Sequence, residues 1–136
     1  MNVLFVAGFS PIVSDPAVAA TFYRNDLGLP LETVQGDYIA VDNWGDSRHL
    51  GIWPLADAAQ SCFGTNEWPT GTPIPQATLE LEVDDVPAAA AELRDKGYEL
   101  IHDARTEPWG QEIARLLTPD GLLIGLSWCP WMHSDD

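Results

Sequence analysis

Two carboxylates on one predicted strand are the first residues whose type and spacing could do chemistry. Glu80 and Glu82 alternate with the apolar residues of ATLELEV (77–83), so both lie on the face opposite to the apolar one. Their spacing places the two carboxylates about 7 Å apart along the strand. Such a pair can carry out general acid–base catalysis, attract a cation, or lie solvated. The sequence leaves these three possibilities open.

His49 is a second candidate for acid–base chemistry. It lies at the start of a predicted strand, 48–55, and its side chain is on the face opposite to the apolar residues Leu50 and Ile52. A histidine there can act as a base, or it can be a hydrogen-bonded structural residue. The other histidines, His102 and His133, have no comparable placement. The sequence contains no nucleophile elbow, phosphate-binding glycine loop or CxxC pair that would indicate another chemistry.

The elements that position these residues occur twice in the same order. Each copy has an apolar strand, a helix that starts at an aspartate with a proline in its first turn and stops at a glycine, and three short strands. Asp15 and Asp85 start the helices, and Gly28 and Gly97 end them. The predicted elements are strand 3–13, helix 15–28 and strands 31–35, 37–42 and 48–55, then strand 77–83, helix 85–97 and strands 99–102, 112–118 and 122–128.

This repeat predicts a single domain over residues 1–136. It divides into module one (1–55), a linker (56–75), module two (76–128) and a tail (129–136). The segment from Pro54 to Pro75 carries four prolines and three Trp, Phe or Cys side chains and is too long for a simple turn, so we interpret it as a functional flap or a packed loop.

The order of elements and several motifs resemble the vicinal oxygen chelate superfamily. The resemblance rests on FYRNDLGL in module one, and on LEVDDVPAAAAELRDKGYEL and PWGQEIARLLTPDGLLIGLSW in module two. That superfamily includes glyoxalase I, extradiol dioxygenases, fosfomycin-resistance enzymes and bleomycin-resistance binding proteins. The resemblance covers roughly residues 3–128. It implies an α+β fold in which two tandem βαβββ modules form a curled mixed sheet around a cleft, usually in a homodimer.

The resemblance also implies metal ligands at four cleft positions, and none of these positions carries a suitable side chain here. They correspond to Gly8, Gly51, Thr78 and Gly125. Glycine offers no ligand atom, and a threonine hydroxyl is a poor ligand beside His or Glu. We therefore expect no metal and no cofactor, a character closest to the metal-free antibiotic-binding resistance proteins of the superfamily.

Aromatic and acidic side chains are the candidates for binding a ligand in the implied cleft. Aromatic rings can stack on a planar ligand, and carboxylates can offset a positive charge. We also expect Gly8, Gly51 and Gly125 to leave open space between them. The candidate residues are Tyr38, Trp44, His49, Trp53, Trp68, Glu80, Glu82, Trp109 and Glu112.

The charge of the chain restricts its partners. Asp and Glu number 21 and Lys and Arg only 6, so the formal net charge is -15. A chain this acidic offers no basic face for nucleic acid or for an anionic membrane, whereas small cations are attracted. The sequence shows no targeting signal, and two cysteines do not make a disulfide scaffold, so we expect a cytoplasmic protein. The expected partners are a small-molecule ligand and a second copy of the chain.

Two functions fit these observations. The first is a metal-independent binding protein that sequesters an aromatic or cationic natural product or antibiotic. The alternative is a divergent enzyme of the same superfamily, a lyase or isomerase that uses a cleft His or Glu as its general base. The sequence favours binding over catalysis without deciding between them, because one fold serves both classes.

Overall fold

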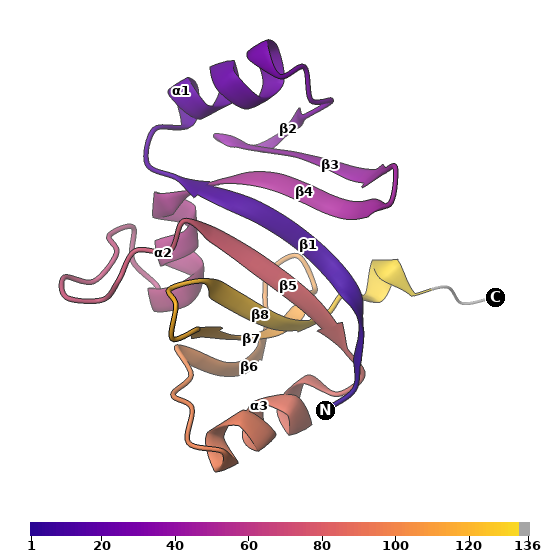
Figure 1. The fold of residues 1–136 in the computed structure, drawn as a ribbon, viewed down its shortest axis with the longest axis vertical. Helices are drawn as coiled ribbons and strands as arrows, with labels where there is room; N and C mark the ends of the chain where they lie inside the picture. The colour runs from indigo at the N-terminus through magenta and orange to yellow at the C-terminus, as the bar shows by residue number, and fades with distance from the viewer. Residues whose placement is uncertain (134–136) are drawn as a thin grey trace.

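The computed structural model describes residues 1–133, and its eight strands form one sheet with two similar halves. The sheet order is β2-β3-β4-β1-β5-β8-β7-β6, with β1 and β5 antiparallel at the centre (Figure 1). Each central strand is parallel to the last strand of its own module. The α+β fold of two βαβββ modules in a curled mixed sheet is therefore confirmed. The strands are β1 (Val3–Val13), β2 (Glu32–Gln35), β3 (Tyr38–Trp44), β4 (Ser47–Pro54), β5 (Ala77–Val83), β6 (His102–Thr106), β7 (Glu112–Leu117) and β8 (Leu123–Trp128).

The two module helices begin at the predicted aspartates. Asp15 Oδ1 accepts a hydrogen bond from Val18 N at 3.2 Å, and Asp85 Oδ1 accepts one from Ala88 N at 3.0 Å. Each bond satisfies an N–H group that has no partner inside the helix, and this fixes where the helix starts. The helices are α1 (Pro16–Ala20), which continues as the π-helical segment η1 (Thr21–Asp26), and α3 (Val86–Asp95).

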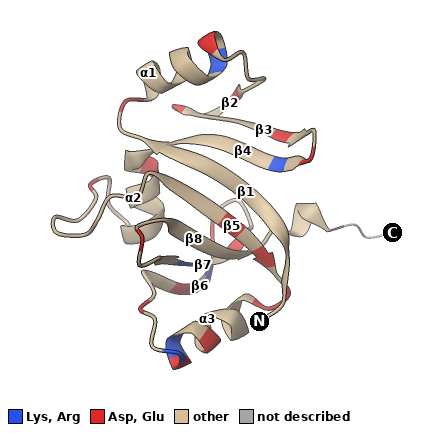
Figure 2. Cartoon of the chain, viewed as in Figure 1, with Lys and Arg blue, Asp and Glu red and all other residues tan. Residues whose placement is uncertain are grey.

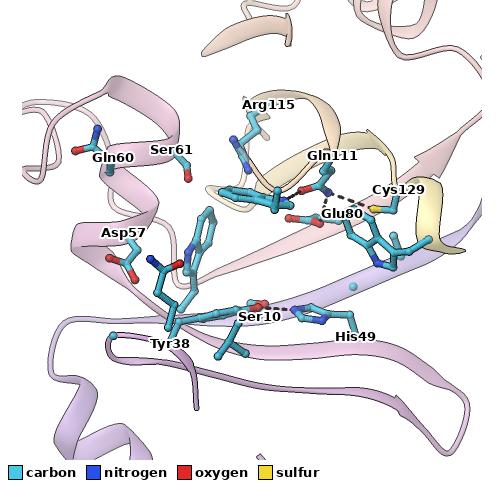
Figure 3. Close-up of a pocket in the computed structure, with 18 of the residues that line it drawn as sticks. Ser10, Tyr38, His49, Asp57, Gln60, Ser61, Glu80, Gln111, Arg115 and Cys129 are labelled. Carbon is cyan, nitrogen blue, oxygen red and sulfur yellow. Dashed lines mark hydrogen bonds between the residues drawn. The ribbon is translucent and has the colours of Figure 1, made fainter. Parts of the chain in front are cut away.

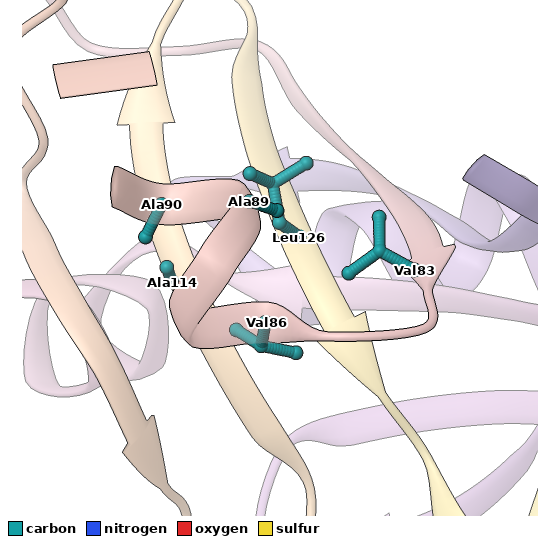
Figure 4. Close-up of a cluster of buried hydrophobic side chains, with 6 residues drawn as sticks. All are labelled: Val83, Val86, Ala89, Ala90, Ala114 and Leu126. Carbon is teal, nitrogen blue, oxygen red and sulfur yellow. The ribbon is translucent and has the colours of Figure 1, made fainter. Parts of the chain in front are cut away.

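Each module helix packs on the same face of the sheet and buries a small core. In module two, Val86, Ala89 and Ala90 of α3 pack against Ala114 of β7 and Leu126 of β8 (Figure 4). Alanines let the helix lie close to the sheet, because they add little volume between the two backbones. A second core lies under α1, and it contains Ala19, Leu31, Ile39 and Ile52. The opposite face of the sheet is left for the site.

The predicted linker contains a helix, which corrects our interpretation of that segment as a flap or loop. Helix α2 spans Leu55–Phe63, packs against β1 and β4, and ends at Gly64 with φ of 77°. Its inner side is made by Ala58, Ala59 and Cys62, all buried. Their spacing is helical, and this was the signal that the prolines around the segment concealed.

Strand β6 begins later than predicted. We expected a strand at 99–102, but the residues after α3 first complete the end of that helix. Tyr98 N donates to Leu93 O at 3.0 Å, and the chain meets β7 only where Ile101 N donates to Arg115 O at 2.8 Å. The chain therefore needs residues 98–101 to pass from the helix end to the edge of the sheet, and the strand starts only at His102.

Strand alternation correctly predicts which residues face the helices, except at the centre of the sheet. Leu81 and Val83 pack in the core under α3, as expected. At the centre, Phe9 lies on the same face as Leu79, its partner on β5, but is 43% exposed. The reason is that α1 packs on β4 and α3 packs on β6, β7 and β8, so neither helix covers β1 (Figure 1).

The acidic residues are spread over both modules, and the few basic ones lie on several different elements (Figure 2). Among the helices within residues 1–133, none is both long enough and apolar enough to cross a membrane.

Candidate ligand-binding site

A cavity of about 830 Å³ lies on the face of the sheet opposite to α1 and α3. Its floor comes from strands of both modules, including β1, β4, β5 and β7. Helix α2 contributes Asp57, Gln60 and Ser61 (Figure 3). The short 3₁₀ helix η2 (Pro130–Met132) contributes Trp131 and Met132. The site is therefore built by both modules, by the former linker and by the tail.

The structure brings together five of the nine residues that we predicted from the sequence to bind a ligand. The lining contains Tyr38, His49, Trp53, Glu80 and Trp109. Their contact with a ligand stays a prediction. Trp44, Trp68, Glu82 and Glu112 lie elsewhere.

Three of these four residues are held away from the cavity by their own elements. Trp44 lies at the end of β3, next to the turn to β4, and is 44% exposed. Trp68 packs edge-on against Phe63 and donates from Nε1 to Pro73 O at 3.0 Å, inside the linker. Glu112 alternates with Ile113 along β7, so its side chain points to the opposite face.

Glu82 is fully buried instead of lining the cleft. Its carboxylate accepts hydrogen bonds from Ser127 Oγ at 2.9 Å, Cys129 N at 2.6 Å and His133 Nε2 at 2.7 Å. The His133 ring in turn stacks on Trp128, with ring centroids 3.6 Å apart. Glu82 therefore fastens the tail to β5, and the tail places Trp131 and Met132 at the cavity.

A hydrogen-bonded chain runs from the cavity toward solvent through module one. The Tyr38 hydroxyl is hydrogen-bonded to His49 Nε2 (Figure 3). His49 Nδ1 in turn lies 2.6 Å from Asp42 Oδ1. A carboxylate can only accept, so in the neutral imidazole Nδ1 carries the proton and Nε2 accepts from the tyrosine. Burial raises the pKa of Tyr38 well above its ordinary value, and the negative charges of Glu80 and Asp42 raise it further. Asp42 was not among the predicted residues.

On the other side of the cavity, Gln111 links two predicted residues. Its Nε2 donates to Glu80 Oε1 at 2.9 Å, and its Oε1 accepts from Trp109 Nε1 at 2.8 Å (Figure 3). The amide therefore fixes both the carboxylate and the indole ring. Gln111 follows Trp109 and Gly110 in a turn, and no sequence pattern indicated its role.

The cavity carries an excess of negative charge. Asp37, Asp57 and Glu80 line it, and within residues 1–133 none of these carboxylates forms an ion pair. Burial raises the pKa of Asp57, and the charge of Asp37 adds to this effect. Arg115 also lines the cavity, but its charge is balanced by Glu107 at 2.9 Å.

The comparison with protein families agrees with the fold. The model of the glyoxalase/bleomycin resistance protein/dioxygenase superfamily matches residues 9–126. The chain belongs to this superfamily. A search of curated proteins found no match.

Solved members of the superfamily and related structures share the fold at low sequence identity. Methylmalonyl-CoA epimerase from Mycobacterium tuberculosis is 20% identical, with a TM-score of 0.61, over 96% of this chain and 91% of the other. A methylmalonyl-CoA epimerase in complex with methylmalonyl-CoA and NH4+ has the same identity and TM-score over 98% of this chain and 99% of that one. A superfamily member from Vibrio splendidus 12B01 is 14% identical, with a TM-score of 0.56, over 88% and 94%. These likenesses extend over both modules and concern the fold.

The residues of this superfamily member do not fit the metal that the resemblance implies. A Cβ atom on Gly51 would lie 2.3 Å from Tyr38 Oη, and one on Gly125 would lie 2.7 Å from Ile113 Cδ1. The expected open space at these two glycines is therefore filled by the chain's own side chains. Thr78 supplies one buried hydroxyl, and residues 1–133 contain no group of three or more His, Cys, Asp or Glu placed to hold a metal ion.

Proposed function

We propose that the protein binds a cationic aromatic small molecule, such as a natural product or antibiotic, and sequesters it without chemical change. One observation carries the proposal: three carboxylates that form no ion pair among residues 1–133 line the same cavity as the indole rings of Trp53, Trp109 and Trp131. A cation over an indole ring gains roughly 0.5–2 kcal/mol, and carboxylates in a partly desolvated cavity add to that attraction. The volume of about 830 Å³ suits a drug-sized ligand.

The proposal is tested with two flat tricyclic probes of opposite charge, 9-aminoacridine and 9-anthracenecarboxylate. Isothermal titration calorimetry should show that the cation binds at one site per chain and that the anion binds at least about tenfold more weakly, a difference of about 1.4 kcal/mol. Equal or tighter binding of the anion would overturn the proposal. Mass spectrometry after overnight incubation should then recover the cation unchanged.

A second function, proton-transfer catalysis, is favoured by the chain from Tyr38 through His49 to Asp42. The Tyr38 oxygen could take a proton from the ligand while its own proton moves to His49 Nε2. The imidazolium that forms would lie beside the Asp42 carboxylate. Structural likeness to epimerases is compatible with this reading at the level of fold.

Deuterium exchange separates the two functions. Any ligand that binds is incubated with the protein in D2O, and its mass is followed with time. Catalysis predicts incorporation that is lost in Tyr38→Phe, whereas sequestration predicts no incorporation beyond the rate without protein.

A further inference from the structure

Arg115 presents an unused hydrogen-bonding edge at the cavity. Its side chain is 1% exposed and lies on β7, and its guanidinium is directed into the site (Figure 3). All hydrogen bonds that the guanidinium makes within residues 1–133 come from Nη1, to Glu107 Oε1 at 2.9 Å and to His102 Nε2 at 3.1 Å. Nε is buried and has no partner in the part of the chain that the structure describes.

The Nη1 side of the guanidinium is held by groups that can only accept from it. His102 Nδ1 lies 2.8 Å from Asp103 O and donates to it, so Nε2 carries the lone pair that faces Arg115. Burial lowers the pKa of His102, and the positive charge of Arg115 also favours the neutral ring. Arg105 approaches Glu107 from outside at 3.3 Å. These contacts fix the guanidinium and leave its Nε/Nη2 edge free.

The guanidinium of Arg115 lies near Trp53, and the strand carrying Arg115 is two strands away from the one carrying Glu80. Arg115 pairs with Gly125 on β8, and Gly125 pairs with Glu80 on β5. The backbones of Arg115 and Glu80 are therefore two strands apart, roughly 10 Å. The guanidinium carbon also lies 5.5 Å from the centre of the Trp53 ring. A ligand stacked on Trp53 would thus hold its substituents near both groups.

We infer that the Nε/Nη2 edge of Arg115 binds an oxygen acceptor of the ligand, a carbonyl or a carboxylate. This inference rests on the proposed function and narrows the ligand class. The ligand carries its positive charge toward Glu80 and an oxygen acceptor toward Arg115. Nε of this edge is buried and has no partner among the described residues, so it gains more from an acceptor than an exposed arginine N–H does, because it gives up no hydrogen bond to water. The edge has the planar, two-donor geometry that suits such oxygens.

The test compares 9-aminoacridine with 9-aminoacridine-4-carboxamide, which adds a carbonyl without changing the charge. In the wild-type chain the carboxamide should bind about tenfold more tightly by calorimetry. The advantage should fall to about onefold in Arg115→Lys, which keeps the charge beside Glu107 but lacks the two-donor edge. Arg105→Lys, which alters the other arginine on Glu107 and lies outside the cavity lining, is the matched control and should keep the advantage.

The outcomes separate this inference from the function on which it rests. If 9-aminoacridine does not bind the wild-type chain, the proposed function fails. If it binds and the carboxamide gives no advantage, or if the advantage survives in Arg115→Lys, only the assignment of Arg115 is wrong. Circular dichroism checks folding. If Arg115→Lys does not fold, the double variant Arg115→Met/Glu107→Gln replaces it, since it removes both members of the buried pair together.

Discussion

At the scale of single residues, Glu80 has the clearest electrostatic role in the cavity. Its carboxylate is oriented by Gln111, and within residues 1–133 it has no cationic partner. We predict that Glu80→Gln weakens binding of 9-aminoacridine several-fold at low salt and less at 500 mM NaCl, because salt already screens part of the attraction. Titrations at the two salt concentrations measure this. An equal loss of affinity at the two salt concentrations would show that Glu80 acts only through its shape or its hydrogen bonds.

The two thiols should be unreactive in the folded chain. Cys62 and Cys129 are both buried and unbonded to each other. Burial, together with the charges of Glu82 and Glu80, raises the pKa of Cys129 to about 12, and burial also raises the pKa of Cys62. Since the thiolate is the reacting form, very little is present at pH 8. Ellman's reagent should therefore label neither thiol quickly under native conditions, and both once the chain is unfolded in guanidinium; fast native labelling of either would contradict this placement.

At the scale of elements, residues 129–133, which we call the strap, are held against the sheet and complete the lining of the cavity. Glu82 holds Cys129 and His133, and Trp131 and Met132 between them line the site. We predict that Glu82→Gln reduces the free energy of unfolding by about 2 kcal/mol, because an amide cannot accept from all the donors that the carboxylate does. It should also weaken binding of 9-aminoacridine, because Trp131 is no longer held.

Hydrogen exchange at residues 129–133 measures the strap directly, and chemical denaturation measures stability. Glu92→Gln is the matched control, since Glu92 makes exposed ion pairs with the N-terminus and Lys96. It should leave both measurements nearly unchanged. Faster exchange in the strap with unaltered affinity would show that the tail does not contribute to binding.

The elements also show how far local sequence patterns reach. Two features that predict the module repeat are local in the sequence. One is the aspartate that begins each module helix, Asp15 or Asp85, and the other is the alternation of apolar and polar residues in β4 and β5. The burial of Glu82 could not be predicted in this way. Alternation indicates the face of the strand on which a side chain lies, but it does not indicate which distant segment packs over that face, and here His133, 51 residues further along the chain, contacts Glu82. Arg115 and Gln111 were missed for a similar reason, because Arg115 contacts His102 on β6 and Gln111 contacts Glu80 on β5, partners that a local pattern does not reveal.

At the scale of the whole molecule, we expect a homodimer. The central strand exposes a group of apolar side chains that neither module helix covers, namely Val3, Leu4, Val6 and Phe9. Light scattering at micromolar concentration should give about twice the chain mass of 14.9 kDa. With a net charge of -15 on each chain, association should strengthen with salt, because screening reduces repulsion between the copies.

A pair of variants locates the contact. Val6→Glu on β1 should yield monomers, whereas Val18→Glu on α1, which alters a valine of similar exposure, should not. A monomer at every salt concentration, or equal effects of the two variants, would contradict a dimer formed through β1.

The side chains that occupy the space above Gly51 and Gly125 also constrain how this protein could evolve or be redesigned. A mutation that puts a histidine at 51 meets the Tyr38 hydroxyl at 2.3 Å from its Cβ, and one at 125 meets Ile113 at 2.7 Å. Each histidine would therefore have to displace a side chain of the preceding strand, the Tyr38 ring at 51 or the end of the buried Ile113 side chain at 125. Moving the Tyr38 ring would cost its hydrogen bond to His49. We therefore expect a library that varies 38 with 51 and 113 with 125 together to yield metal-binding variants more readily than one that varies the two glycines alone.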